Sequence, residues 1–157
     1  MDRRFEAIYR DNARYVYNVA VGMLRNKTEA EDIMQNVFIK LFDNFDAFRG
    51  DSSIRTYLYR MTVNKCLDLF RLRKIRESKL EKIEIPQEKT HAAGNELYSL
   101  LEKLDPDLKA PVLLSEIGGF SYREIGEILG INLGTVKSRI HRGMNRLRDI
   151  ATKEASI

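Results

Sequence analysis

Apolar residues recur every three or four positions through most of this chain, and the alternation of apolar and polar positions typical of strands is nearly absent. This periodicity predicts an all-α protein. The first helix is expected from Asp2 to Leu24. The residues expected to face its core are Phe5, Ile8, Tyr9, Val16, Val19, Ala20 and Met23.

Polar residues with capping chemistry mark the starts of the next two predicted helices. Thr28 and Glu31 have the spacing of a capping box, in which a hydroxyl and a carboxylate bind the first free backbone N–H groups. The helix that begins there is expected to end near Phe45. The polar stretch 49–53 then breaks the pattern and offers new N-caps for a third helix over Ile54–Leu72.

From residue 73 the apolar period fades, charged residues accumulate, and Pro86 and Gly94 flank a polar run. Such a composition favours an interdomain linker that is partly helical at its start. Four short helices are expected beyond it, over Asn95–Leu104, Asp107–Ile117, Ser121–Leu129 and Asn132–Ala151. The pattern therefore predicts two small helical domains, of three helices over residues 1–75 and of four helices over residues 95–157, joined by a linker over residues 76–94.

The composition agrees with a globular protein, because 43% hydrophobic and 32% charged residues suffice for a core and a solvated surface. Neither a run of eighteen apolar residues nor a signal-peptide pattern is present, so we expect a cytoplasmic protein without membrane insertion. The lone Cys66 falls in an apolar helical pattern, which favours a buried thiol. His91 and His141 have no neighbouring ligand residues, so neither a metal site nor a cofactor is expected.

The net charge of +4 is unevenly distributed. Residues 1–48 carry −1, residues 49–82 carry +6, residues 83–120 carry −4 and residues 121–157 carry +3. Two basic blocks separated by an acidic one suggest two separate contacts with a polyanion. Ordinary solvated faces are the alternative explanation of such a pattern.

The strongest local pattern spans residues 121–139, SYREIGEILGINLGTVKSR. Ser121 and Glu124 have the spacing of a second capping box. Gly130 stands where a helix end requires a left-handed residue, and Asn132 can cap the helix that follows. Two helices joined by so short a turn predict a DNA-binding helix-turn-helix.

The second helix of this motif divides its side chains between two faces. The inward face is expected to hold Val136, Ile140, Gly143, Leu147 and Ile150. The opposite face holds Ser138, His141, Arg142 and Asn145, with Lys137, Arg139 and Arg146 beside them. Basic residues bind guanine edges and phosphates, and Ser and Asn make smaller contacts, so this composition is typical of a major-groove reader.

The segment SYREIGEILGINLGTVKSRIHRGMNRLR resembles the C-terminal domain, called region 4, of extracytoplasmic-function sigma factors, which reads the promoter −35 element. Leu133 departs from the family, which often has Pro there, and some rigidity is expected to be lost without loss of function. The −35 contacts that the resemblance implies are Ser115, Thr135, Lys137, Ser138, Arg139, His141 and Arg142.

The segment 29–42, EAEDIMQNVFIKLF, resembles the helix with which the N-terminal region 2 of this family binds the clamp coiled coil of the largest polymerase subunit. Helical spacing turns Ile33, Met34, Val37, Phe38 and Leu41 inward. The polymerase-binding residues that the resemblance implies are Asp32, Gln35, Asn36, Ile39, Lys40 and Asp43. A lone exposed isoleucine is usually unremarkable, but Ile39 among amides and carboxylates also fits a compact protein-binding patch.

Residues 48–65, FRGDSSIRTYLYRMTVNK, resemble the −10 recognition segment of the family. Opening a promoter requires a base to leave the stack and be held by an aromatic or amide surface near cations. The resemblance implies a pocket in the loop 48–53, closed by Asn64. Tyr57 stands where the family commonly has Trp, which raises the question of whether promoter melting is weakened. Tyr59 is expected in the core. The implied −10 contacts are Phe48, Arg49, Asp51, Ser52, Ser53, Tyr57, Asn64 and Lys65.

Both motifs in this order indicate a sigma factor, and the resemblance implies core RNA polymerase, promoter DNA and an anti-sigma factor as partners. No phosphate-binding loop, HExxH motif or nucleophile elbow is present, so an enzyme is not expected. A stand-alone helix-turn-helix regulator would leave residues 29–65 without a role. An inhibitor that mimics a sigma domain would have no need of the basic residues 49–82. The sequence does not identify the promoters, the activating signal or the anti-sigma factor.

Overall fold

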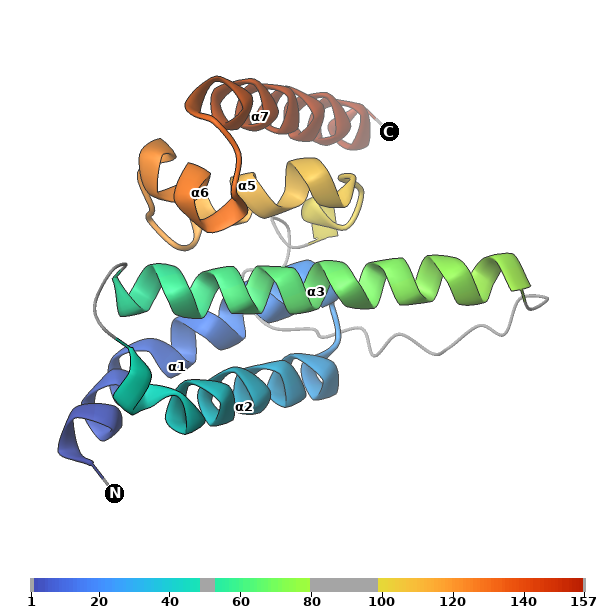
Figure 1. Ribbon diagram of the computed structural model, residues 1–157. Coiled ribbons are helices and arrows are strands. Elements are labelled where there is room, and N and C mark those ends of the chain that lie inside the picture. Colours follow the sequence, from blue (N-terminus) through green and yellow to red (C-terminus); the bar gives the residue numbers. More distant parts are fainter. Residues whose placement is uncertain (1, 49–52, 80–98, 157) are drawn as a thin grey trace. The chain divides into compact units, whose positions relative to one another are not determined.

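The computed structural model describes residues 2–48, 53–79 and 99–156, and all regular elements within these residues are helices (Figure 1). The prediction of an all-α protein is therefore confirmed. The chain divides into two compact units, Met1–Thr90 and His91–Ile157.

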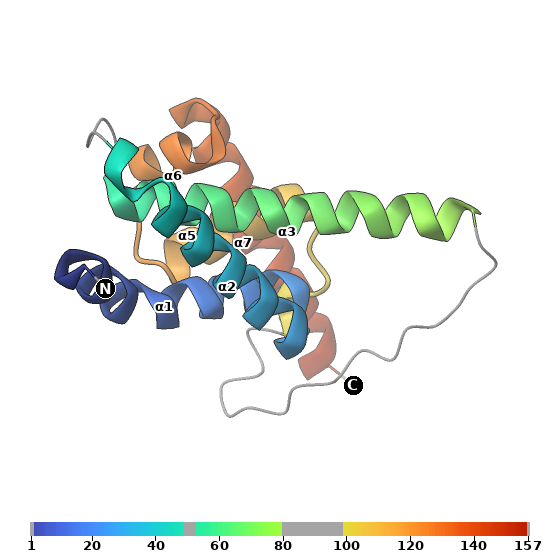
Figure 2. The same ribbon diagram turned by 60° about the horizontal axis from the view of Figure 1, so that its bottom comes forward.

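The first unit is built from three long helices and one short one. They are α1 (Arg3–Leu24), α2 (Lys27–Asp43), the 3₁₀ helix η1 (Phe45–Ala47) and α3 (Ile54–Lys79). Each of the three α-helices contacts the other two, as Figures 1 and 2 show. Their shared core contains Val16, Val19, Met23, Val37, Leu41, Leu58, Tyr59 and Val63, together with Cys66, whose predicted burial is confirmed.

The capping box predicted at Thr28 is wrong, because the N-cap of α2 is Asn26, two residues earlier. Arg25 ends α1 in the left-handed region, with φ 54°, and this sharp reversal makes Asn26 the next residue with extended backbone. The Asn26 side chain then accepts a hydrogen bond of 3.0 Å from the Glu29 N–H and caps α2. Thr28 is left exposed inside the first turn.

The third helix begins where the sequence predicts and ends later. Ser53 Oγ accepts from the Thr56 N–H at 3.0 Å, so Ser53 caps α3 at Ile54. The helix then continues past Leu72 to Lys79, so residues 73–79 are the helical start expected of the linker. Arg73 forms an ion pair with Glu29 of α2, and its guanidinium lies 5.9 Å from the Phe70 ring centroid.

The far end of α3 extends beyond α1 and α2 in both views (Figures 1 and 2). Residues 73–79, the charged run that suggested a linker, are helical for two reasons. Most of them are good helix formers, and the ion pair of Arg73 with Glu29 of α2 supports the first turn of the run. The predicted linker from residue 80 to residue 94 lies outside the described residues. So does the first part of the helix predicted over Asn95–Leu104, of which residues 99–101 are helical.

The second unit contains α5 (Pro106–Glu116), α6 (Tyr122–Leu129) and α7 (Leu133–Ala155). Helix α5 packs against both α6 and α7. The predicted bounds of α5 are right to within a residue, and α7 continues four residues beyond the predicted Ala151. The core of this unit contains Leu101, Leu104, Val112, Leu113, Leu114, Phe120, Ile125, Ile128, Val136 and Ile140.

Helices α5 and α7 approach closely at Gly143. A Cβ atom at this position would lie 2.6 Å from Cγ2 of Val112, a fully buried and β-branched residue with no room to move. The same atom would lie 3.6 Å from the Leu108 carbonyl oxygen. The crossing of the two helices therefore requires glycine.

We predict that Gly143→Ala lowers the free energy of unfolding by up to about 2 kcal/mol, because overpacking costs ~1–3 kcal/mol and alanine contributes only ~1 kcal/mol in a helix. Urea unfolding followed by far-UV circular dichroism measures it. The matched control is Gly134→Ala in the same helix, where the nearest atom, Asn132 Oδ1, is 3.5 Å away. This control should gain about 0.5–1 kcal/mol. Equal stability of both variants would contradict the close helix crossing.

Candidate nucleic-acid interface

Cap and backbone interactions define both ends of α6, the second of which begins the turn to α7. Ser121 Oγ accepts from the Glu124 N–H at 3.2 Å, and the Ser121 N–H donates to Glu124 Oε1 at 3.1 Å, so the second predicted capping box is confirmed. Gly130 ends α6 in the left-handed region, with φ 67°. The Ile131 N–H then donates to the Gly126 carbonyl oxygen at 3.1 Å.

Asn132 starts α7 as predicted. Its Oδ1 accepts from the Thr135 N–H at 2.8 Å and from the Thr135 hydroxyl at 2.9 Å. Because the end of α6 and the start of α7 are both fixed at defined residues, the turn holds the two helices in one relative orientation. The two helices and the turn between them form the helix-turn-helix that the sequence predicts.

The two faces of α7 separate as expected. Val136, Ile140, Gly143 and Leu147 are buried, and Ile150 is half-buried. Lys137, Ser138, His141 and Arg142 are exposed on the outward side. Along this row Arg142 Nε donates to the Ser138 carbonyl oxygen at 3.4 Å, and Asn145 Nδ2 lies 3.1 Å from His141 Nε2. The side chains of the row take no part in the core.

The remaining predicted −35 residues are less exposed. Thr135 and Arg139 are half-buried on α7, and the Thr135 hydroxyl is engaged with the cap at Asn132. Ser115 is half-buried on α5, near its C-terminal end. The structure therefore brings six of the seven residues together on the first turns of one helix, and it places Ser115 on a different helix.

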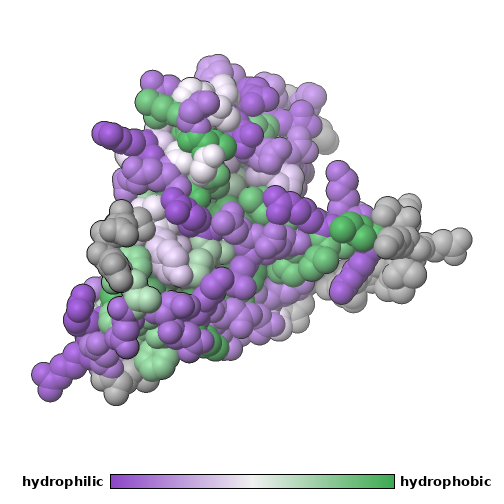
Figure 3. All heavy atoms as spheres, in the orientation of Figure 1, coloured by the Kyte–Doolittle hydropathy of each residue, from purple (hydrophilic) through white to green (hydrophobic). Residues whose placement is uncertain are grey.

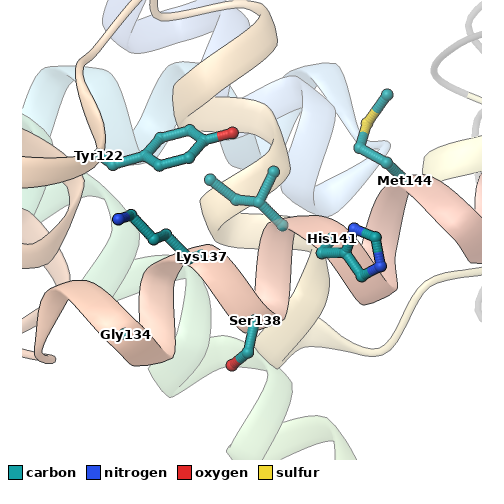
Figure 4. A pocket seen from close by; sticks show the side chains of 7 residues that line it. Tyr122, Gly134, Lys137, Ser138, His141 and Met144 are labelled. Atoms are coloured by element: carbon teal, nitrogen blue, oxygen red, sulfur yellow. The ribbon is translucent and has the colours of Figure 1, made fainter.

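A shallow groove runs between the start of α6 and α7, beside the outward row (Figure 4). In this view the Tyr122 ring extends over α7, the Lys137 side chain points toward it, and Ser138 points away. Met144 lines the same groove. Sequence reasoning did not assign Tyr122 or Met144 to the site, although an aromatic residue directly after the capping Ser121 is a readable signal.

The described −10 residues lie in α3 or just before it. Phe48 follows η1, Ser53 and Tyr57 stand at the start of α3, and Asn64 and Lys65 lie near its middle. Arg49, Asp51 and Ser52 lie outside the described residues. The rings of Phe48 and Tyr57 are in contact, with centroids 5.6 Å apart and an interplanar angle of 50°. Both residues keep part of their surface exposed.

The other predicted −10 residues differ in their surroundings. Asn64 is exposed and lies seven residues after Tyr57, which places both on the same side of α3. Lys65 is half-buried. Ser53 Oγ donates to Thr56 Oγ1 at 2.8 Å in addition to capping the helix, so its hydroxyl already has partners in this structure.

Tyr59 belongs to the core, as expected. Its side chain is fully buried, and burial raises the pKa of its hydroxyl to about 12. The guanidinium of Arg55 lies 5.8 Å from the ring centroid. The aromatic surface offered at the start of α3 is therefore that of Phe48 and Tyr57.

All six predicted polymerase-binding residues, Asp32, Gln35, Asn36, Ile39, Lys40 and Asp43, are exposed on α2. The inward face is buried as predicted, except that Met34 is half-buried. Phe42, which sequence reasoning did not select, is also exposed on this side of the helix. It follows Ile39 by three residues, so an extension of the same helical stripe would have found it.

The described residues contain no group of three or more His, Cys, Asp or Glu side chains that could hold a metal ion. Among the helices over these same residues, none is both long and apolar enough to cross a membrane.

Comparison with protein families gives two matches in chain order. Residues 8–76 match sigma-70 region 2, and residues 94–147 match sigma-70 region 4. The chain is 36% identical to the extracytoplasmic-function sigma factor SigE of Mycolicibacterium smegmatis, over 97% of this chain and 63% of that protein's length. It is 33% identical to SigW of Bacillus subtilis, over 90% of this chain and 83% of SigW.

Two solved structures have the same fold. The sigma factor RpoE from Bartonella quintana, in complex with the anti-sigma factor NepR, superposes with a TM-score of 0.79 over 96% of this chain and 98% of that chain, at 24% identity. CnrH, in complex with the cytosolic domain of CnrY, gives a TM-score of 0.76 over 96% and 89% of the two chains, also at 24% identity.

Proposed function

Because the chain belongs to the extracytoplasmic-function family of RNA polymerase sigma factors, we propose that it directs core polymerase to specific promoters and that its two units share this task. Recognition of the −35 duplex belongs to the second unit. Polymerase docking and strand opening at −10 belong to the first.

The observation that carries this proposal is the exposed row on α7. Lys137, Ser138, His141 and Arg142 lie on the outward face of a capped helix-turn-helix, in the first half of the helix that enters a major groove in such motifs. Arg142 is suited to a guanine edge, and Lys137 to a phosphate. Thr135, Arg139 and Ser115 complete the proposed contacts from less exposed positions.

For strand opening, Phe48 and Tyr57 supply aromatic faces and Asn64 an exposed amide on the same side of α3. Stacking on an aromatic ring and hydrogen bonding to an amide are the two interactions that hold an unpaired base. Lys65 adds a cation nearby, and Arg49, Asp51 and Ser52 belong to the same proposed pocket. Ser53 contributes by fixing the start of α3.

Docking on polymerase is assigned to the exposed side of α2, over Asp32, Gln35, Asn36, Ile39, Lys40 and Asp43. We further propose that an anti-sigma factor regulates the chain, because a similar sigma factor has been solved in complex with one. We also propose that the protein works in the cytoplasm, because polymerase and promoter DNA are found there. The chemistry of RNA synthesis is left to polymerase, so the chain itself is not an enzyme.

We predict that the isolated chain binds promoter duplex weakly and acquires sequence preference only with core polymerase. The reason is that its two DNA-binding surfaces lie on separate units, each with few phosphate contacts. Fluorescence anisotropy with labelled promoter duplex, with and without core enzyme, measures both states. Tight and sequence-specific binding by the isolated chain would favour a stand-alone regulator. Transcription from a cognate promoter with core enzyme excludes an inhibitory mimic.

Arg142→Ala should cost about 1–3 kcal/mol at one base pair of the −35 element and relax the preference there, because a bidentate contact to a base edge is lost. Transcription in vitro from a set of −35 variants measures the preference at each position. The control Arg148→Ala removes the same charge farther along α7 and should leave every preference unchanged. A uniform loss across all variants with Arg142→Ala would make Arg142 a phosphate contact instead.

Asn64→Ala should impair promoter opening while core binding stays intact, since the amide that holds the unpaired base is removed from an exposed position. Permanganate footprinting of holoenzyme on a promoter reports unpaired thymines, and binding to core polymerase is measured on the same preparation. Thymine reactivity equal to that of the unaltered protein would remove Asn64 from the proposed pocket.

A further inference from the structure

Two side chains on the outward side of α7 are hydrogen-bonded to each other. Asn145 Nδ2 lies 3.1 Å from His141 Nε2, and the spacing of four residues places the amide one turn beyond the ring. His141 is exposed and lines the groove shown in Figure 4, whereas Asn145 is half-buried. The exposed ring is therefore held from one side by a less exposed side chain.

The chemistry of this contact fixes where the hydrogen of the imidazole lies. An amide nitrogen donates hydrogen bonds and accepts none, so His141 Nε2 must be the acceptor. An imidazolium, which carries hydrogen on both nitrogens, could not accept this bond. A neutral ring whose Nε2 accepts carries its hydrogen on Nδ1. Asn145 therefore selects one of the two tautomers of His141 and leaves Nδ1–H as the donor that the ring offers.

Without such a contact, an exposed histidine has no fixed tautomer. Most of the protein surface seen in Figure 3 is hydrophilic, and water can bind either nitrogen of a ring on such a surface. The ring also rotates about its side-chain torsions, and this freedom is lost when the ring binds a base. The hydrogen bond to Asn145 restricts both before DNA is bound, so the ring is preorganised for one kind of contact.

A ring that offers only a donor discriminates between base edges in the major groove. Guanine presents acceptors at N7 and O6, adenine at N7 and thymine at O4, whereas cytosine presents only its N4 amino group. Cytosine would place a donor against Nδ1–H and leave both groups without an acceptor, which is costly. The exposed Lys137 and Arg142 beside the ring also carry donors only, so the row as a whole favours base edges rich in acceptors.

We propose that Asn145 is a positioning residue for −35 recognition, which holds His141 as its Nδ1–H tautomer so that the ring donates to an acceptor on a base edge and rejects cytosine there. This inference rests on the proposed recognition of the −35 duplex by α7. It adds a residue that acts through His141 without touching the base, and it gives His141 a defined chemical preference.

The first measurement reports the tautomer directly. The ¹⁵N chemical shifts of the imidazole in the labelled full-length chain, in mildly alkaline buffer, distinguish a ring nitrogen that carries hydrogen from one that does not. Unaltered His141 should carry its hydrogen on Nδ1. Asn145→Ala should shift the hydrogen to Nε2, because that is the tautomer that free histidine prefers in water. The signals of the second histidine, His91, are assigned with the variant His91→Gln.

The second measurement is the base preference of holoenzyme formed from core polymerase and each full-length variant. Fluorescence anisotropy measures its binding to promoter duplexes that carry each base in turn at every −35 position, and His141→Ala identifies the position that the ring contacts. The unaltered chain should disfavour cytosine there by about 3- to 10-fold, the effect of one hydrogen bond. With Asn145→Ala this discrimination should fall below about 2-fold, because the freed ring can present either nitrogen.

Two further variants separate positioning from a general effect on α7. Asn145→Gln restores an amide beside the ring and should retain most of the discrimination against cytosine. The matched control is Asp149→Ala, which removes an exposed polar side chain one turn farther along the same helix. This control should change neither the tautomer of His141 nor the base preference.

Three outcomes overturn the inference. The first is a preference of the unaltered chain for cytosine at this position, which would mean that the ring presents an acceptor. The second is unchanged rejection of cytosine and an unchanged Nδ1–H signal with Asn145→Ala, which would leave Asn145 without a positioning role. The third is an unchanged preference at every position with His141→Ala. If Arg142→Ala still relaxes one position in that case, −35 recognition by α7 stands without His141, and if neither variant changes any preference, the proposed recognition fails as well.

Discussion

The residue at which each helix starts is fixed by its N-cap, and from there each successive side chain points about 100° further around the helix axis. In α7 this choice is made by Asn132, whose side chain binds the Thr135 N–H at 2.8 Å. With the helix fixed there, Val136 and Ile140 enter the core and Ser138 and Arg142 face outward. Ser53 and Asn26 cap the starts of α3 and α2 in the same way.

Much of this arrangement could be predicted from the sequence, because the caps at Ser121, Gly130, Asn132 and Ser53 use residues that strongly prefer those roles. The start of α2 was missed because Arg25 adopts a left-handed conformation that its residue type does not signal. Residues 73–79 were expected as a helical start of the linker and not as part of α3, because their support, the pair of Arg73 with Glu29, joins residues far apart in sequence. Tyr9 was expected in the core and is 44% exposed, because its exposure depends on which neighbours cover it, and a helical periodicity does not contain that information.

The two kinds of partner proposed for this sigma factor are kept apart by charge. The outward row of α7 is basic, and the exposed side of α2 combines carboxylates and amides with apolar side chains. DNA is attracted to the basic row of α7 and repelled by the carboxylates of α2. Charge alone therefore disfavours the binding of DNA to α2, whatever the shapes of the two surfaces. On α3, Arg71 and Arg73 are paired with carboxylates within the unit.

The outward row of α7 contributes almost nothing to the stability of its own domain, since its side chains lie away from the core. Substitutions in this row change the promoter sequence that is recognised and leave the stability of the fold unchanged. Substitutions in the core change the stability and leave the recognised sequence unchanged. Promoter preference can therefore diverge between duplicated copies one residue at a time, each intermediate remaining a folded and working subunit. The same separation makes Lys137, Ser138, His141 and Arg142 the residues to exchange in building a transcription system that ignores the host's own promoters.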